Sequence, residues 1–221
     1  MNLNFDFLDE KLEIGQSTIL VLEDVNVFAK VVQGFYQYTG ENDFLKIFDN
    51  KQKNIKPNEM ILISDILGFD INTRSNLKLI YQDLEEQLND KPDVKSKIER
   101  LKIELANLIS HELVEHELDL VGDKITFQEL FLALGIHIEV MDDTIFEKAS
   151  EILHIYKYLS RMKLLVFINC ASYLNFNELE QIFEYVELNN KPVLFVEPRK
   201  IHGFIQHILD EDYFLSCENV V

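Results

Sequence analysis

The sequence predicts an α/β fold in which a mainly parallel sheet, formed by both ends of the chain, is interrupted by an α-helical insertion. Apolar runs of strand length occur near both ends, whereas the middle is rich in Leu, Ile, Glu, Lys and Gln at helical spacing. With 7 Gly and 4 Pro in 221 residues, the chain has too few turn residues for an all-β fold. We therefore expect an α/β head domain from residues 1–65 and 136–221, and an α-helical leg domain from residues 66–135.

The N-terminal part of the chain alternates between strand and helix signals. NFDFL (4–8) alternates apolar and polar residues, and TILVLED (18–24) has the continuous apolar run of a buried strand. Asp24 is a suitable N-cap for the amphipathic helix that follows. The next expected strands, joined by a basic loop, are FLKIF (44–48) and MILIS (60–64).

The middle of the chain, residues 73–118, has the pattern of two amphipathic helices. The first apolar stripe ends at NDKP (89–92), where proline interrupts the helix, and a second stripe starts at once. Thr126 and Glu129 have the spacing of a capping box, in which each side chain bonds the backbone N–H of the other residue. A shorter helix is therefore expected from there to Gly135.

The C-terminal part returns to the α/β pattern. A second capping box, Thr144 with Glu147, opens a helix that is expected to run to about Arg161. Two buried strands separated by a helix follow, and this succession implies a right-handed parallel crossover. The elements expected here are a strand HIEVM (137–141), a strand LLVFIN (164–169), a helix from Asn175 to Asn189, a strand VLFVE (193–197), a last helix, and the closing segment YFLSC (213–217).

The composition is that of a soluble globular protein, with 47% hydrophobic and 27% charged residues. Two cysteines, Cys170 and Cys217, are too few for a disulfide-rich secreted scaffold or a cysteine-based zinc module. The start, MNLNFDFLDE, lacks the basic and continuous apolar regions of a signal peptide. No apolar run approaches the ~20 residues that a membrane helix needs, so we expect a cytoplasmic protein with no membrane partner.

The net charge of −18 opposes binding to nucleic acid when it is taken as a bulk property. Screening limits exposed interactions to about 8 Å at physiological salt, so separate patches can act independently. For any single patch, a solvated surface is the simplest interpretation. The chain contains basic islands at 46–56 and 154–165, each with a balance of +3, and acidic stretches at 111–130 and 206–221, with balances of −5 and −4.

Known phosphate-binding motifs are missing, although an open parallel sheet invites comparison with nucleotide-binding enzymes. Neither GxxxxGK[ST] nor GxGxxG follows any expected strand. Glu23 and Asp24 stand where a phosphate would approach the helix N-terminus, and they would repel it. Asn169 ends a buried strand where a nucleotide hydrolase would have an aspartate for Mg²⁺. Nucleotide hydrolysis is therefore not indicated.

Two other enzyme patterns also fail. HELVEH (111–116) has Glu115 where the second histidine of HExxH belongs, so the two histidines do not share a helix face. Cys170 follows a buried strand, but no spacing places a histidine or an acid beside it, and a small buried hydrophobe is the simpler interpretation.

Acidic residues gather after the second long helix. Hard cations such as Ca²⁺ take about six to eight oxygens from flexible segments, and Gly122 lies within this one. The spacing does not match an EF-hand loop, so a solvated acidic face and a metal site both remain open. The residues are Glu115, Glu117, Asp119, Asp123 and Glu129.

Segments along the full length carry a family resemblance. They are MNLNF (1–5), TILVLEDV (18–25), ILGFD (66–70), HELDLVGDKIT (116–126), DTIFEKASEIL (143–153), VLFVEPR (193–199) and ILDEDYFL (208–215). In this order they resemble the non-nuclease CRISPR-associated adaptation protein of subtype II-A loci. The resemblance implies a non-catalytic, ring-shaped homotetramer that binds the ends of linear double-stranded DNA through its central channel during spacer acquisition. It also implies an α/β head, similar to nucleotide-binding folds without their phosphate loop, and a helical leg.

The same resemblance implies ligands and partners. Ca²⁺ would bind near the junction of leg and head, through Glu117, Asp119, Asp123 and Glu129, with Glu115 in reserve. DNA phosphates would meet basic residues repeated by the ring, for which the candidates are Lys46, Lys51, Lys53, Lys56, Lys157, Arg161, Lys163 and Arg199. Other CRISPR adaptation proteins, including the integrase and the effector nuclease, are expected partners. The alternative is an acidic protein-binding scaffold that does not bind DNA directly.

Overall fold

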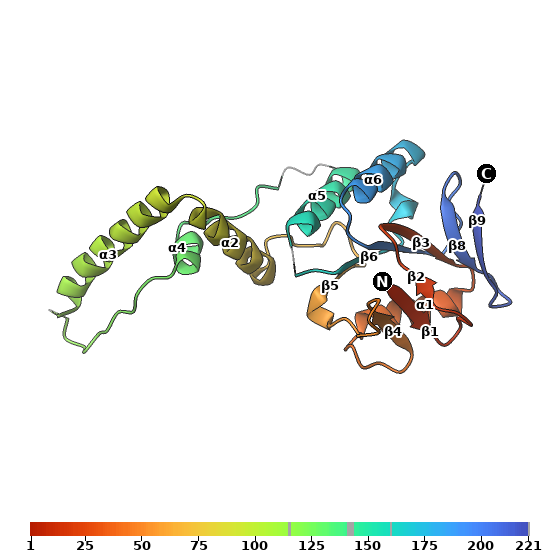
Figure 1. Cartoon of the computed structure of the whole chain (residues 1–221), viewed down its shortest axis with the longest axis horizontal. Helices are drawn as coiled ribbons and strands as arrows, with labels where there is room; N and C mark the ends of the chain where they lie inside the picture. The colour runs from red at the N-terminus through yellow and green to blue at the C-terminus, as the bar shows by residue number, and fades with distance from the viewer. Residues whose placement is uncertain (115, 141–143, 160, 221) are drawn as a thin grey trace. The chain divides into compact units, whose positions relative to one another are not determined.

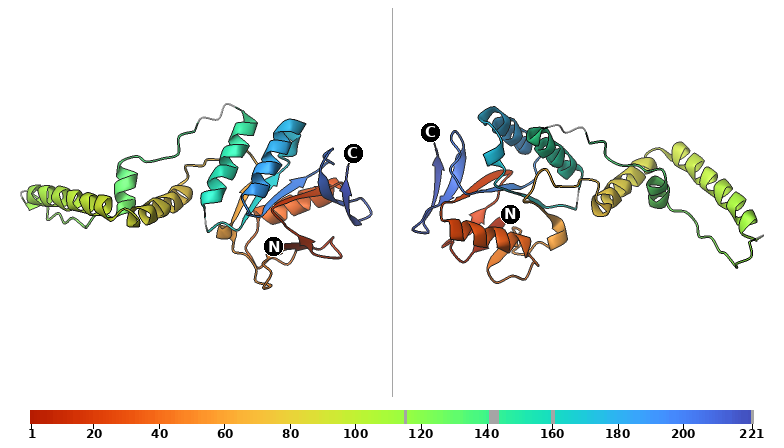
Figure 2. Two further views of the ribbon diagram at one scale, coloured as in Figure 1. Left: turned by 45° about the horizontal axis from the view of Figure 1, so that its top comes forward. Right: turned by 180° about the vertical axis from the view of Figure 1, so that it is seen from behind.

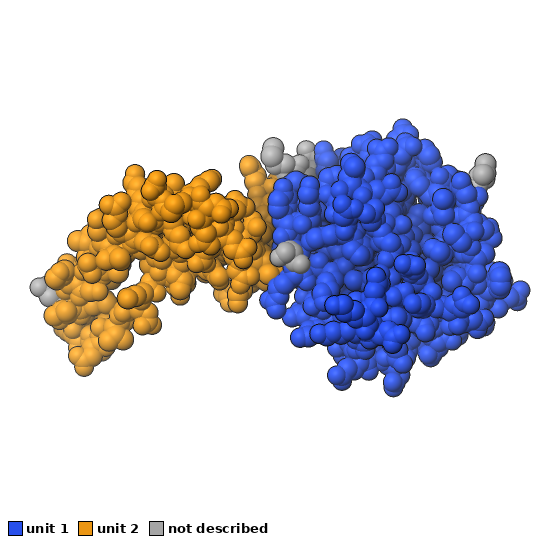
Figure 3. All heavy atoms as spheres, viewed as in Figure 1, with its two compact units in different colours: residues 1–69, 141–221 blue, residues 70–140 orange. Residues whose placement is uncertain are grey.

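The computed structural model describes residues 1–114, 116–140, 144–159 and 161–220 (Figure 1). Contacts within the chain divide it into two compact units, which are coloured separately in Figure 3. Unit 1 comprises residues 1–69 and 141–221, and unit 2 comprises residues 70–140. These limits lie a few residues beyond those expected for the head and the leg.

Unit 1 contains a six-stranded sheet with the strand order β5-β6-β7-β3-β8-β9. All neighbouring pairs are parallel except β8 and β9, which form an antiparallel pair. The α/β fold with a mainly parallel sheet is thus confirmed. The strands are β3 (Ser17–Leu22), β5 (Met60–Ile63), β6 (Leu164–Ile168), β7 (Val193–Glu197), β8 (Ile205–Leu209) and β9 (Leu215–Asn219).

A second, antiparallel sheet in unit 1 has the order β2-β1-β4. Its strands are β1 (Asn2–Phe5), β2 (Leu12–Glu13) and β4 (Leu45–Phe48). The strand expected at 44–48 is therefore present, but it does not join the parallel sheet. The strand expected at 4–8 begins and ends earlier in the chain, because residues 2–5 are the ones that pair with β4.

Helices cover both faces of the six-stranded sheet (Figure 2). On one face, α1 (Val25–Tyr36) and the small sheet share a core with Leu20, Val166 and Leu194, which are fully buried. On the other face lie α5 (Ile145–Tyr158) and α6 (Phe176–Leu188), where Phe183 of α6 meets Phe195 of β7 edge-on at 4.8 Å. Burial on both faces explains why β3, β6 and β7 are continuous apolar runs rather than alternating ones.

The expected helix starts are confirmed by their hydrogen bonds. Asp24 Oδ1 accepts the backbone N–H groups of Asn26 and Val27 at 2.7 and 2.9 Å. The capping boxes of Thr144 with Glu147 and of Thr126 with Glu129 are both formed. These bonds satisfy N–H groups that have no partner within their helices.

Two expected elements are wrong. Residues 137–140 form no strand, and Met141 lies outside the described residues. The side-chain amide of Asn72 donates to the C=O of Ile138 and accepts from its N–H. These backbone groups therefore bond a side chain instead of a neighbouring strand. The last helix is absent from the described chain as well, because residues 205–209 form β8 beside β3. Gln206 is fully buried there and bonds the backbone of Ile201 through both ends of its amide.

Unit 2 consists of three helices among its described residues, α2 (Arg74–Asn89), α3 (Pro92–Val114) and α4 (Phe127–Ala133). The break expected at 89–92 separates α2 from α3. The core of unit 2 is small and centres on Tyr81, Phe127 and Phe131. The long helix α3 has no fully buried residue. Across both units, no helix within the described residues is long and apolar enough to cross a membrane.

Candidate nucleic-acid interface

A tight turn after β4 presents two exposed lysines, Lys51 and Lys53. We call residues 49–54 the lysine loop. An isolated antiparallel bridge between Phe48 and Asn54 closes its base. The loop lies within the basic island at 46–56, and it connects β4 to the segment that leads into β5.

The second basic island meets the first through Lys163. Its ammonium Nζ lies 2.9 Å from Oε1 of Glu59, and its backbone N–H donates to the Glu59 carbonyl at 2.7 Å. The backbone N–H of Lys56 donates to Oε2 of the same carboxylate at 2.9 Å. These bonds, first that of Lys56 and then that of Lys163, lower the pKa of Glu59. Segments about a hundred residues apart in the chain thus share one carboxylate.

The lysine loop lies at the same edge of the parallel sheet as Lys163. Its Asp49 has a lowered pKa, first because of the Lys53 backbone N–H, then because of the Lys51 backbone N–H, and further because of the nearby charges of Lys163 and Lys51. A shallow pocket of about 340 Å³ is lined by Asp49, Lys51 and Pro192, among others. Pro192 directly precedes β7, so the loop sits at the amino-terminal edge of the parallel sheet.

The remaining candidates of this group have different surroundings. Lys56 precedes the short 3-10 helix η1 (Pro57–Glu59), which leads into β5. Lys157 is exposed in the last turn of α5, and Arg161 is exposed on the way to β6. Lys46 is exposed on β4, opposite Asn4 of β1.

The geometry brings one group of these residues together, which we call the amino-edge cluster. It consists of Lys51, Lys53, Lys56 and Lys163 with the acids Asp49 and Glu59.

Lys191 also lies at this edge and was not expected from the sequence. Its Nζ donates to the carbonyl oxygens of Tyr156 and Leu159 at 2.7 and 2.9 Å, which satisfies the end of α5. Partial burial lowers its pKa. Lys191 therefore anchors α5 beside the cluster. A lysine directly before a buried strand is a weak signal, because nothing in the sequence says which carbonyls it will meet.

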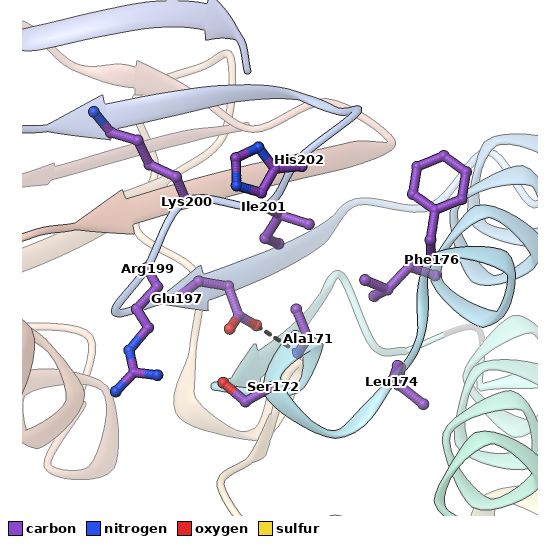
Figure 4. A pocket seen from close by; sticks show the side chains of 10 residues that line it. Ala171, Ser172, Leu174, Phe176, Glu197, Arg199, Lys200, Ile201 and His202 are labelled. Atoms are coloured by element: carbon purple, nitrogen blue, oxygen red, sulfur yellow. Dashed lines mark hydrogen bonds between the residues drawn. The ribbon is translucent and has the colours of Figure 1, made fainter. Parts of the chain in front are cut away.

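Arg199 is separated from the cluster, because it follows the carboxyl end of β7. Parallel strands point the same way, so residues after β7 and residues before β5 and β6 lie at opposite edges of the sheet. Arg199 instead lines an open pocket of about 380 Å³ (Figure 4). The structure thus places Arg199 apart from the amino-edge cluster.

The carboxyl-edge pocket is built around a buried acid, Glu197, which is 1% exposed. Its Oε1 accepts the backbone N–H of Ala171, the first residue of the 3-10 helix η2 (Ala171–Tyr173), at 3.0 Å (Figure 4). Burial raises the pKa of Glu197 to about 7, although bonds from the backbone N–H groups of Ala171 and Cys170 act against the rise. The carboxyl group therefore takes up a proton at a higher pH than an exposed glutamate does.

Open α/β sheets commonly bind ligands at this carboxyl edge, but the phosphate position here is filled. The Asp24 carboxylate occupies the N-terminus of α1, and Glu23 forms an ion pair with Lys200 at 3.3 Å. Cys170 is buried, and burial, together with the charge of Glu197, raises the pKa of its thiol. A thiol held in its protonated form is a poor nucleophile.

The acidic segment does not form a metal site within the described residues, where no three Asp, Glu, His or Cys side chains converge. Glu115 lies outside the described residues, and Glu117, Asp119 and Asp123 are exposed. Glu129 Oε2 accepts from both the backbone N–H and the hydroxyl group of Thr126 at 2.7 Å. The predicted calcium ligands therefore do not fit an ion in this arrangement, and calcium binding stays a prediction.

Comparisons with known proteins identify the family. A family profile described as "CRISPR-associated protein (Cas_Csn2)" matches residues 37–213. The chain is 53% identical over 218 residues to the CRISPR-associated protein Csn2 of Enterococcus faecalis, covering 99% of each chain. It is 48% identical over 221 residues to Csn2 of Streptococcus agalactiae, covering 100% of each. The chain belongs to the Csn2 family of CRISPR-associated proteins.

A solved structure supports the fold. The crystal structure of Stu0660 of Streptococcus thermophilus matches 100% of this chain and 76% of its own, with a TM-score of 0.60 and 15% identity. At this identity the likeness concerns the fold alone. Membership of the Csn2 family confirms the resemblance that the sequence segments carried, and it gives the chain a role in CRISPR biology.

Proposed function

We propose that this Csn2-family chain assembles into a ring-shaped homotetramer that binds the ends of linear double-stranded DNA, independently of sequence, during CRISPR spacer acquisition. The observation that carries the proposal is the joining of two basic islands at the amino-edge cluster through Lys163 and Glu59. In a chain of net charge −18, lysines placed together are the feature that can attract phosphate.

The chemistry of the cluster suits the DNA backbone rather than the bases. Its cations are exposed lysines, which act as point charges and contact phosphate without reading sequence. One copy of the cluster supplies few contacts. Four copies around a channel would repeat them, and the acidic remainder of the surface would face away from the DNA.

Self-association is supported by the helical unit. Four apolar residues of α3 recur at spacings of seven, four and three residues, which places them on one helix face. They are Val94, Leu101, Leu105 and Leu108, with exposed fractions of 48, 56, 50 and 68%. Exposed apolar residues on one helix face are typical of a helix that packs against another chain.

The proposed function is non-catalytic. The Csn2 relatives are named as CRISPR-associated proteins, and the buried Cys170 thiol has a raised pKa, which makes it a poor nucleophile. Cleavage and integration of DNA would then fall to partners in the cytoplasm, for which we propose the integrase and the effector nuclease of the same locus.

The experiment that tests this function combines native mass with binding of a linear duplex at several salt concentrations. We expect a tetramer and a DNA complex that weakens steeply as salt rises. An acidic protein-binding scaffold would give no duplex complex at any salt concentration. A tetramer that never binds duplex would therefore reject the DNA-binding proposal in favour of the scaffold.

A further inference from the structure

One carboxylate organises the lysine loop. Oδ1 of Asp49 accepts the backbone N–H groups of Lys51 and Lys53 at 2.8 and 3.0 Å. The backbone of Asp49 adds two bonds, since its N–H donates to the Lys53 carbonyl and its carbonyl accepts from the N–H of Gln52, both at 2.9 Å. Every backbone bond within the turn thus begins or ends at Asp49 among the described contacts.

The turn contains a conformation that needs support. Gln52 has φ of 59°, in the left-handed region that residues other than glycine rarely adopt. Hydrogen bonds from N–H groups to a carboxylate are stronger than those to a neutral acceptor. The Asp49 carboxylate therefore compensates for the unfavourable backbone at the residue that lies between the two lysines.

The base of the loop is held by other groups. The hydroxyl group of Tyr38 is buried between the carbonyl oxygens of Ile47 and Ile55, at 3.2 and 3.0 Å. The side-chain amide of Asn54 donates to the Gly40 carbonyl at 2.8 Å. Removing the Asp49 side chain therefore leaves these anchors in place and loosens only the turn that carries Lys51 and Lys53.

We propose that Asp49 is a positioning residue for DNA binding, whose carboxylate fixes the backbone of the lysine loop so that Lys51 and Lys53 meet phosphates together. This inference rests on the proposed function. It predicts an effect opposite in sign to simple electrostatics, because a negative charge beside two lysines would by itself repel DNA. A turn whose backbone is already ordered before DNA binds loses less conformational entropy on binding, and so binds more tightly.

The test compares two variants that remove the same charge. Asp49→Asn keeps a side-chain oxygen that can accept both N–H groups, as asparagine does in Asx turns, whereas Asp49→Ala keeps none. We expect Asp49→Ala to weaken binding of a linear duplex several-fold, and Asp49→Asn to bind at least as tightly as the unmodified protein. Asp43→Ala, which removes an exposed charge just before β4, is the matched control and should not weaken binding.

Amide hydrogen exchange gives a readout besides DNA binding. Residues 50–54 should stay protected in Asp49→Asn and exchange faster in Asp49→Ala, while the tetramer mass is unchanged. The inference is overturned if Asp49→Ala binds DNA as tightly as Asp43→Ala, or if the alanine and asparagine variants weaken binding equally. Lys51→Glu with Lys53→Glu separates the two proposals. If that double variant binds normally, the interface itself is wrong, and if it loses binding while Asp49→Ala does not, only the positioning role fails.

Discussion

Lys163 and Glu59 are joined twice, by an ion pair of 2.9 Å between Nζ and Oε1 and by a backbone bond of 2.7 Å from the Lys163 N–H to the Glu59 carbonyl. The backbone bond follows from the parallel pairing of β5 with β6, because Glu59 and Lys163 directly precede those strands. The ion pair is partly exposed and adds little to stability. The parallel pairing of β5 with β6 aligns two basic segments that the sequence keeps far apart.

Reversing the charge of the lysine loop should weaken DNA binding and reduce its salt dependence. Each neutralised phosphate contributes about −0.9 to the slope of log K against log salt, so one or two contacts from each of four subunits give a slope of about −4 to −7. Lys51→Glu with Lys53→Glu should flatten this slope and weaken binding to all sequences alike, as measured by titrations at several salt concentrations.

The control for this variant is Lys11→Glu with Lys91→Glu, which changes the net charge equally at exposed positions outside the cluster. It should keep most of the slope. If the loop variant binds DNA normally, the loop lies outside the channel, and the island with Lys157 and Arg161 becomes the better candidate.

Polar substitutions on the exposed stripe of α3 should disrupt the assembly. Leu101→Gln with Leu108→Gln keeps helix-forming residues of similar length but removes apolar surface that another copy would bury. Native mass spectrometry should show species smaller than a tetramer, with the helix content by circular dichroism retained. The matched variant Leu67→Gln with Leu188→Gln alters exposed leucines of unit 1 and should remain tetrameric. A tetramer in both variants would show that the stripe is not an assembly surface.

Glu197 should make stability fall as pH rises towards neutrality. Its pKa is raised from 4.5 to about 7, so its contribution is complete below the lower value and is lost as pH rises through the upper one. A difference of this size corresponds to roughly 3 kcal/mol at most. Thermal unfolding of Glu197→Gln at fixed protein concentration should lack this part of the pH dependence. The exposed Glu180→Gln should keep it, and parallel Tm curves for the unmodified protein and Glu197→Gln would contradict the assignment.

Calcium should raise the Tm if the acidic segment binds it. A ligand specific to the folded protein stabilises it by about 2.7 kcal/mol at a concentration a hundred times its Kd. Asp119→Ala or Asp123→Ala should abolish the rise, whereas Asp9→Ala, at an exposed position of unit 1, should keep it. A full calcium response in both segment variants would place the ion elsewhere, in agreement with the lack of convergence among the described carboxylates.

The elements that could be predicted are those whose signals are local. Three helices begin with a capping side chain that bonds nearby backbone N–H groups, namely Asp24, Thr126 and Thr144. The strands that are buried on both faces are apolar throughout. The failures are non-local. The segment 137–140 alternates like a strand, but the Asn72 side chain takes its hydrogen bonds, and 205–209 pairs with a strand almost two hundred residues away.

The basic residues of the candidate interface could be predicted from the sequence, but which of them lie together in the fold could not. Charge counting found both islands, yet nothing in either island says that β5 and β6 are neighbours across the helical insertion, which is what joins Lys163 to Glu59. Arg199 was grouped with the lysines by charge alone and lies at the opposite edge of the sheet. The roles of Asp49 and Glu59 were missed because an acid inside or beside a basic island looks unfavourable until its backbone partners are known.

The most direct test of the central claim compares one linear duplex with a covalently closed circle of the same sequence, at the same salt concentration and with the same tetramer. If DNA enters a ring by its end, the linear form should bind and the circle should bind poorly, and opening the circle with a restriction enzyme should restore binding. Equal affinity for circle and linear duplex would contradict entry by the end, and failure to bind either form would contradict the DNA-binding function as a whole.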